Sequence, residues 1–177
     1  MMNVEQGSNT KQSRAPWSAL VTGAAGAATV TLAHEVVRQL VPNPPRMDRI
    51  GMSALSRVLH ALGMSAPRGE KLRGYTLLGD LAGNALFYAP LALSKGKQPI
   101  VRGLALGTAA GLGAVFLTPM LGLPKRHRGT TLRTQAMTVA LYAVGGIAAG
   151  AVASLLQKRN TAATLPPGDV VEPATLD

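Results

Sequence analysis

The fold is decided by residues 100–121, which read IVRGLALGTAAGLGAVFLTPML. This stretch has about the length that a helix needs to cross the hydrocarbon core of a bilayer, roughly 20 residues. Arg102, near its start, is its one charged residue. Its glycines recur at helical spacing, because Gly103, Gly107 and Gly111 form two consecutive GxxxG steps. The stretch predicts a membrane-spanning helix with a packing face of small residues, which serves either contacts within the chain or self-association.

Three further apolar segments have a similar length. They cover residues 17–40, 72–93 and 132–156. The first is rich in Ala, Gly and Thr, and it reaches spanning length only if His34 and Glu35 are included. Because short loops join the four segments, consecutive helices are expected to pack antiparallel. We therefore predict an all-α fold, a four-helix transmembrane bundle within a transmembrane domain of residues 16–157.

A fifth helical pattern covers residues 46–63, which read RMDRIGMSALSRVLHALG. Its apolar residues recur three and four positions apart, and Arg49 and Arg57 lie on the opposite, polar face with Arg46 at the start. The segment is too short to span a bilayer. It predicts an amphipathic interfacial helix between the first and second spans, with basic side chains toward the lipid headgroups. The alternative is a surface helix of a soluble bundle.

Composition fits a small membrane protein. Of the 177 residues, 47% are hydrophobic and 15% are charged, and 20 are glycine. The mean hydropathy is +0.20. The absence of cysteine excludes disulfides, thiol chemistry and cysteine-based metal sites. Polar residues 1–15 and the Pro-rich acidic residues 158–177 are expected to form disordered tails.

The chain is strongly basic, with a net charge of +10. Its cations gather in the loops between apolar segments, which is the layout of a multi-pass membrane protein whose partner is the lipid bilayer. Nucleic-acid binding is not expected, because aromatic stacking residues do not accompany the basic clusters. The first and third loops carry more Lys and Arg than the other polar segments, which predicts both termini outside the cytoplasm. A cleaved signal peptide ending near Ala33 is the alternative reading of the first segment.

Polar side chains concentrate in one half of the predicted bundle. An ionised Asp80 within a span costs on the order of 2.5–3.5 kcal/mol, so it needs a partner or a wet cavity. Because neighbouring helices are antiparallel, the end of the first segment meets the start of the second and fourth. A candidate intramembrane polar pocket is therefore formed by His34, Glu35, Asp80, Asn84, Gln135 and Thr138.

This pocket has two interpretations. In one it responds to protons or ions, with His34 titrating beside Asp80 or Glu35. In the other it is a satisfied polar network that locks the helices together. A lipid enzyme with His34 and Glu35 as acid and base is a third hypothesis, but the sequence supplies no evident nucleophile, metal set or cofactor motif. We therefore expect a non-enzymatic protein without metal or cofactor.

One region also resembles small uncharacterised bacterial integral membrane proteins over residues 17–155. The likeness rests on AHEVVRQLVPNPPRMD at 33–48 with Gly51, on GDL at 79–81 and NALFY at 84–88, and on TQAMT at 134–138. It implies a multi-pass protein of the bacterial inner membrane and no particular activity. It also implies that a group of polar residues belongs together, namely His34, Glu35, Arg46, Asp48, Asp80 and Asn84.

We therefore expect a small multi-pass membrane protein with a structural or accessory role, with a homo-oligomer or a membrane-protein partner as open possibilities. The alternative function is that of a proton- or ion-coupled transporter or channel subunit that uses the pocket around His34 and Asp80.

Overall fold

The structure is a computed structural model that describes residues 5–42, 44–93, 98–120 and 131–162. These residues form helices and short connections and contain no strand, so the all-α prediction is confirmed for this part of the chain. The helices are α1 (Glu5–Leu40), α2 (Met47–Ala61), α3 (Gly69–Tyr88), α4 (Pro90–Leu93), α5 (Pro99–Met120) and α6 (Leu132–Ala162).

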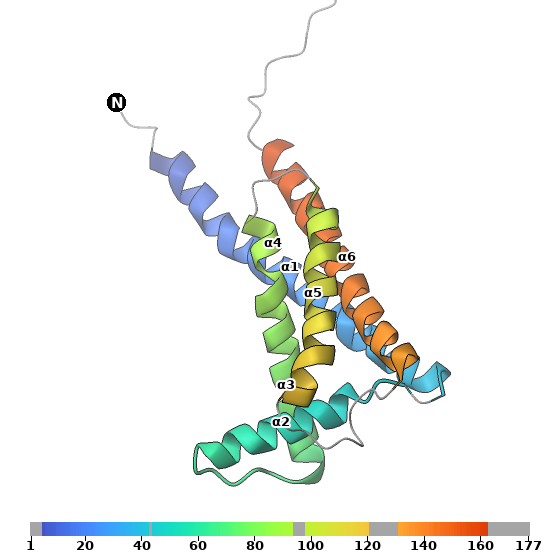
Figure 1. The fold of residues 1–177 in the computed structure, drawn as a ribbon. Helices are drawn as coiled ribbons and strands as arrows, with labels where there is room; N and C mark the ends of the chain where they lie inside the picture. Colours follow the sequence, from blue (N-terminus) through green and yellow to red (C-terminus); the bar gives the residue numbers. More distant parts are fainter. Residues whose placement is uncertain (1–4, 43, 94–97, 121–130, 163–177) are drawn as a thin grey trace, which may run out of the picture.

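The long helices α1 and α6 form the centre of the bundle. Helix α6 packs against α5 on one side and α1 on the other, and α1 in turn packs against α3. Figure 1 shows α2 lying across the N-terminal part of α3. This is the opposite end of the molecule from the start of α1 and the end of α6. This arrangement leaves one end of the bundle covered by a crosswise helix.

Three helices are long and apolar enough to cross a membrane, namely at Pro16–Leu40, Pro99–Phe116 and Leu132–Thr161. These agree with three of the four predicted spans. The segment predicted at 72–93 is not among them, since α3 carries Glu70, Lys71, Arg73 and Asp80 within its 20 residues. Its apolar content is thereby diluted below that of the other three helices.

The same segment is divided into two helices. Helix α3 ends at Tyr88, where the Ala89 amide still donates to the Ala85 carbonyl at 3.0 Å. Pro90 has no amide hydrogen and its ring crowds the preceding turn, so the regular hydrogen-bond ladder stops there. Ala89 keeps helical backbone angles, and α4 follows directly. The expected single helix is therefore α3 with a short continuation.

The N-terminal segment differs from the expected disordered tail of residues 1–15. Helix α1 begins at Glu5 and continues through Pro16 to Leu40. Glutamate, glutamine, lysine and arginine are favourable helix formers, and they occur repeatedly in this polar stretch. At the other end, α6 includes residues 158–162 of the predicted acidic tail, and residues 163–177 lie outside the described part.

Helix α2 coincides with the amphipathic pattern predicted at 46–63. It has no buried residue, and its first turn begins after Arg46, whose carbonyl accepts hydrogen bonds from the amides of Arg49 and Ile50 at 3.1 and 3.2 Å. Gly51 brings α2 close to α3, because a Cβ at this position would lie 2.5 Å from the Cγ2 atom of Thr76. This contact fixes the crosswise helix on the side of α3.

Glycines bring α5 and α6 into backbone contact. An added Cβ at Gly103 would collide with the carbonyl oxygen of Gly146, and one at Gly146 would collide with that of Gly103. Further along, a Cβ at Gly107 would collide with the Tyr142 carbonyl oxygen, and one at Gly111 would lie 2.6 Å from the Val139 Cα. The predicted small-residue face therefore packs within the chain against α6, which occupies the surface that self-association would need.

Helix α1 is held in the same way near its middle. A Cβ at Gly23 would collide with the Ala85 carbonyl oxygen of α3, and one at Gly26 would lie 2.6 Å from the ring of Tyr88. Tyr88 is fully buried, as are Val30 and Ala149 beside it. The three helices α1, α3 and α6 therefore meet around one tyrosine.

The close glycine contact between α5 and α6 predicts that two Gly→Ala substitutions change the unfolding free energy in opposite directions. Gly146→Ala places a methyl group against the Gly103 backbone, which cannot move aside, and should lower the unfolding free energy by about 1–3 kcal/mol. Gly79→Ala, on α3, meets nothing within 4 Å and should raise it by about 0.5–1 kcal/mol through helix propensity. Equilibrium unfolding in mixed detergent micelles measures both. Equal effects of the two substitutions would contradict the α5–α6 interface.

Candidate functional site

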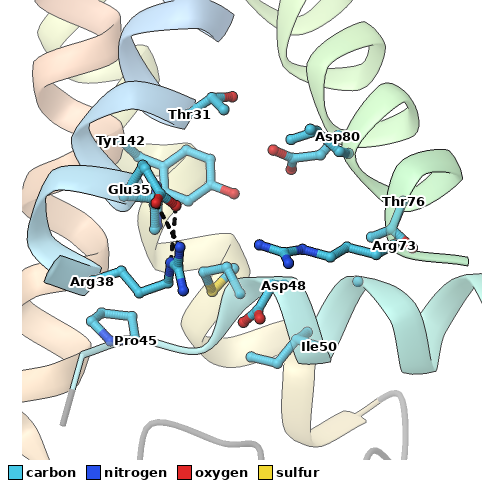
Figure 2. Close-up of a pocket in the computed structure, with 14 residues that line it drawn as sticks. Thr31, Glu35, Arg38, Pro45, Asp48, Ile50, Arg73, Thr76, Asp80 and Tyr142 are labelled. Atoms are coloured by element: carbon cyan, nitrogen blue, oxygen red, sulfur yellow. Dashed lines mark hydrogen bonds and ion pairs between the residues drawn. The ribbon is translucent and has the colours of Figure 1, made fainter. Parts of the chain in front are cut away.

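A cavity of about 420 Å³ opens at the end of the bundle that α2 covers. Its walls come from the last turns of α1, the start of α2, the first half of α3 and Tyr142 of α6. Figure 2 shows these side chains converging on one space. The acidic, basic and histidine residues that line it are His34, Glu35, Arg38, Asp48, Arg73 and Asp80.

Glu35 and Arg38 form one neutral pair within α1. The Arg38 Nε donates to Glu35 Oε2 at 2.9 Å, and the Arg38 Nη2 donates to Glu35 Oε1 at 2.5 Å. The Gln39 amide also donates to Oε1, at 3.0 Å. These residues lie three and four positions apart, where helical side chains are neighbours. The carboxylate of Glu35 is thus fully occupied by its own helix.

His34 is held by its own helix and by α6. Its Nδ1 lies 2.9 Å from the Val30 carbonyl oxygen, and because a carbonyl only accepts, Nδ1 carries the hydrogen of this bond. Its ring meets Tyr142 edge to face, with centroids 5.7 Å apart. The Nε2 atom is buried and has no hydrogen-bond partner among the described atoms. Neither Glu35 nor Asp80 holds His34 by a hydrogen bond, which differs from the expected arrangement.

Asp80 nevertheless lies beside His34 in the cavity. The two groups are close enough to interact electrostatically, and the Asp80 carboxylate also lies within reach of the Asn84 amide one turn further on. Asn84 is buried and reaches toward the Tyr142 side chain as well. His34, Asp80 and Asn84 are therefore brought together around Tyr142, as the antiparallel arrangement predicts.

Arg73 and Asp48 complete the cavity from α3 and α2. Figure 2 shows Arg73 extending from α3 into the cavity, with Asp80 above it and Asp48 below it in that view. The charges act across helices, since Arg73 attracts Glu35 and Asp48 attracts Arg38. The one ion pair within 4 Å in the described cavity lining is Glu35–Arg38. Arg73, Asp48 and Asp80 therefore face the cavity without a close ionic partner there.

Arg73, Arg38 and Tyr142 were not among the predicted pocket residues. Arg73 lies seven residues before Asp80 and thus on the same helical face. The periodicity of α3 therefore contained a usable signal for Arg73, whereas the approach of Tyr142 depends on how α6 is rotated.

Three of the six predicted pocket residues, Asn84, Gln135 and Thr138, do not line the cavity. Thr138 is buried, but its hydroxyl donates to the Thr134 carbonyl of its own helix at 3.0 Å. Gln135 is half-buried near the start of α6, and neither residue lines the cavity. Of the predicted basic residues, Arg46 is half-buried before α2, while Arg49 and Arg57 are exposed on that helix.

A tyrosine contact links the helices deeper in the bundle than the cavity. The Tyr88 hydroxyl donates to the Tyr142 carbonyl oxygen at 2.9 Å, linking α3 to α6 across the bundle. Next to this bond, Gly26 accommodates the Tyr88 ring and Gly23 meets the Ala85 backbone. Side chains and backbone thus fill the space between α1, α3 and α6 beyond the cavity.

The side chains of the lining favour a charged molecule as the ligand over a bound metal ion. Within the described residues, no group of three or more His, Asp or Glu side chains is placed to hold a metal. Glu35 is satisfied by Arg38 and Gln39, which leaves Asp48, Asp80 and Arg73 for other partners. Charged side chains at a partly hydrated site are stabilised most by a ligand that supplies the opposite charge and hydrogen bonds.

The Tyr88–Tyr142 hydrogen bond predicts a loss of stability in Tyr88→Phe. The substitution keeps the ring against Gly26 and removes one hydroxyl, so we expect the unfolding free energy to fall by about 0.5–1.5 kcal/mol. Tyr75→Phe is the matched control, because Tyr75 on the same helix is 59% exposed. Unfolding in mixed micelles should show no change for this control. A neutral Tyr88→Phe would mean that the hydroxyl does not link α3 to α6.

Comparisons of the chain with protein-family models, with curated proteins and with solved structures found no match.

Proposed function

We propose that this chain is a multi-pass protein of the bacterial inner membrane, in which α3 and α4 form a fourth embedded segment and α2 lies in the interface. The outer face of α3 supports this placement, because Tyr75, Leu78 and Leu86 are 59%, 63% and 76% exposed. Lipid accepts such an apolar face at no hydrophobic cost, whereas water does not. The assignment to a bacterial membrane rests on the sequence resemblance over residues 17–155.

We assign this protein a non-enzymatic accessory role, in which the cavity binds a charged ligand at one boundary of the membrane. One observation carries this role. Arg73, Asp48 and Asp80 reach the same cavity from two helices and have no close ionic partner in its lining. Charged groups within a membrane are costly unless a partner or water satisfies them. A bound ligand would supply that partner.

An enzymatic role has less support. In an acid–base pair, His34 and Glu35 would both have to be free to exchange protons with a substrate. Instead, Glu35 accepts three hydrogen bonds from Arg38 and Gln39, and the His34 Nδ1 is bonded to Val30. The remaining nitrogen of His34 has no hydrogen-bond partner among the described atoms, so it is not paired with a nucleophile in this structure.

A proton- or ion-coupled transporter subunit is the second candidate. The observation that favours it is the buried and unpartnered Nε2 of His34, within electrostatic reach of Asp80. The filled space around Tyr88 argues against conduction in this conformation, so transport would require a rearrangement of α3 against α1. Proton flux into liposomes that Asp80→Asn abolishes would favour this candidate over the accessory role.

Four embedded segments predict a specific labelling pattern. The chain has no cysteine, so single substitutions give a clean background. Ser65→Cys lies between α2 and α3, and Ser94→Cys lies after α4. If α3 and α4 cross the membrane, a membrane-impermeant maleimide should label Ser94→Cys from outside intact cells and Ser65→Cys only in inverted vesicles. Labelling of both from one side would reject the fourth segment.

The accessory role predicts a ligand that stays bound during purification. Native mass spectrometry of the full chain released from membranes should show small-molecule or lipid adducts. Arg73→Gln and Asp80→Asn should each lower adduct occupancy about tenfold, because each removes one charged contact worth about 1.4 kcal/mol. The matched controls Arg68→Gln and Glu70→Gln lie on exposed positions outside the cavity and should retain the adducts. Equal occupancy in all variants would count against binding in the cavity.

A further inference from the structure

The charges of the cavity are not balanced. Its lining contains three carboxylates, Glu35, Asp48 and Asp80, against two guanidinium groups, Arg38 and Arg73. Glu35 and Arg38 neutralise each other in a two-bond pair. The remainder is one cation, Arg73, between two anions. A purely anionic ligand would meet an excess of negative charge, and a purely cationic one would leave Arg73 without an anionic partner.

The Arg73 guanidinium is suited to an oxyanion. It extends freely into the cavity in Figure 2, and its planar fork of N–H donors matches phosphate and carboxylate oxygens. Further donors at this end of the site are few, because Arg38 is committed to Glu35 and the Thr76 hydroxyl donates to the Leu72 carbonyl at 2.8 Å. An anionic group of the ligand is thus expected at Arg73.

Asp80 and Asp48 are suited to an ammonium group. Carboxylates accept strong hydrogen bonds from a primary ammonium, and the described lining does not hold the three ligands that a metal ion would need. A quaternary ammonium binds best in a cage of aromatic rings. This lining contains two aromatic rings, those of Tyr142 and His34, which do not make such a cage. The site therefore fits a cation that carries N–H bonds.

The place of the cavity points to a lipid as the source of this ligand. It lies at the end of the predicted spans, beside the amphipathic α2, which is the depth of lipid headgroups. Apolar side chains complete its wall, among them Met47, Ile50 and Leu77. A headgroup could occupy the charged part while its glycerol end meets this apolar wall.

Resting on the proposed binding role, we infer that the cavity holds a zwitterion with a phosphate and a primary ammonium, and that the headgroup of phosphatidylethanolamine is its source. The phosphate binds Arg73, and the ammonium binds Asp80 and Asp48. The water-soluble phosphoethanolamine shares this chemistry, and the experiment separates the two sources.

The test titrates the full chain in detergent micelles with three lipids of identical acyl chains, followed by native mass spectrometry. Dioleoyl phosphatidylethanolamine should bind about tenfold more tightly than dioleoyl phosphatidylcholine, which has no N–H bond, and than dioleoyl phosphatidylglycerol, which has no cation. Asp80→Asn and Asp48→Asn should each remove most of this preference. Glu70→Gln, a carboxylate on α3 outside the cavity, should keep it.

A second measurement does not depend on charge substitutions. Thr31 lines the cavity, and its hydroxyl is buried without a hydrogen-bond partner among the described atoms, so Thr31→Cys is a mild change. In this otherwise cysteine-free chain, phosphatidylethanolamine should slow alkylation of Thr31→Cys about tenfold. Alkylation of Ser65→Cys, at an exposed position outside the cavity, should be unaffected.

The outcomes separate the two proposals. Headgroup preference for phosphatidylethanolamine that is lost in Asp80→Asn supports the inference, and phosphoethanolamine that competes at equal concentration would reassign the source to a soluble compound. Equal binding of the three lipids, lowered by Arg73→Gln, would overturn the zwitterion while the binding role stands. Failure of every lipid and of phosphoethanolamine to bind or to protect Thr31→Cys would overturn both.

Discussion

The close approach of α1, α3, α5 and α6 through glycine is the constraint on which the rest of the structure depends. Where Gly103 meets Gly146 and Gly23 meets Ala85, no side chain separates the backbones. In lipid there is little hydrophobic drive between helices, so tight packing of this kind must hold them together. From Pro16 onward, α1 has its glycines at 23 and 26, and its later turns carry His34, Glu35 and Arg38 instead. The helices consequently separate at that end, and the cavity occupies the space.

Helix α2 closes the separated end because of how it is connected. Pro44 and Pro45 direct the chain away from α1, and the crosswise helix then packs on α3 through Gly51 and Thr76. Asp48 enters the cavity from the first turn of α2, where a carboxylate also interacts favourably with the helix dipole. The same residue thus contributes to the start of a helix and to the charge of the site.

The sequence predicts the helices well and the site only in part. Apolar length and periodicity predict α2, α5, α6 and the apolar part of α1, because each of these patterns depends on local residues, whereas the polar start of α1 at Glu5 is not predicted. Antiparallel order was sufficient to bring His34, Asp80 and Asn84 to one end. What could not be predicted depends on helix rotation: Thr138 turns its hydroxyl to the Thr134 carbonyl, and Tyr142 instead reaches His34. Pro90 marks the break after α3 in the sequence, and the weak hydropathy of α3 follows from four charged residues, of which Arg73 and Asp80 line the cavity.

The position of the cavity agrees with the energetics of its charges. A net negative site near the middle of a bilayer would pay a large desolvation penalty, which rises as water becomes less accessible. At the end of the bundle, Asp80 remains accessible to the cavity while Tyr88, two turns deeper, is fully buried. The change from charged to apolar lining occurs over those two turns of α3. A ligand held here would keep its charged part near water and its apolar part toward the bundle, which is the natural orientation of a membrane lipid.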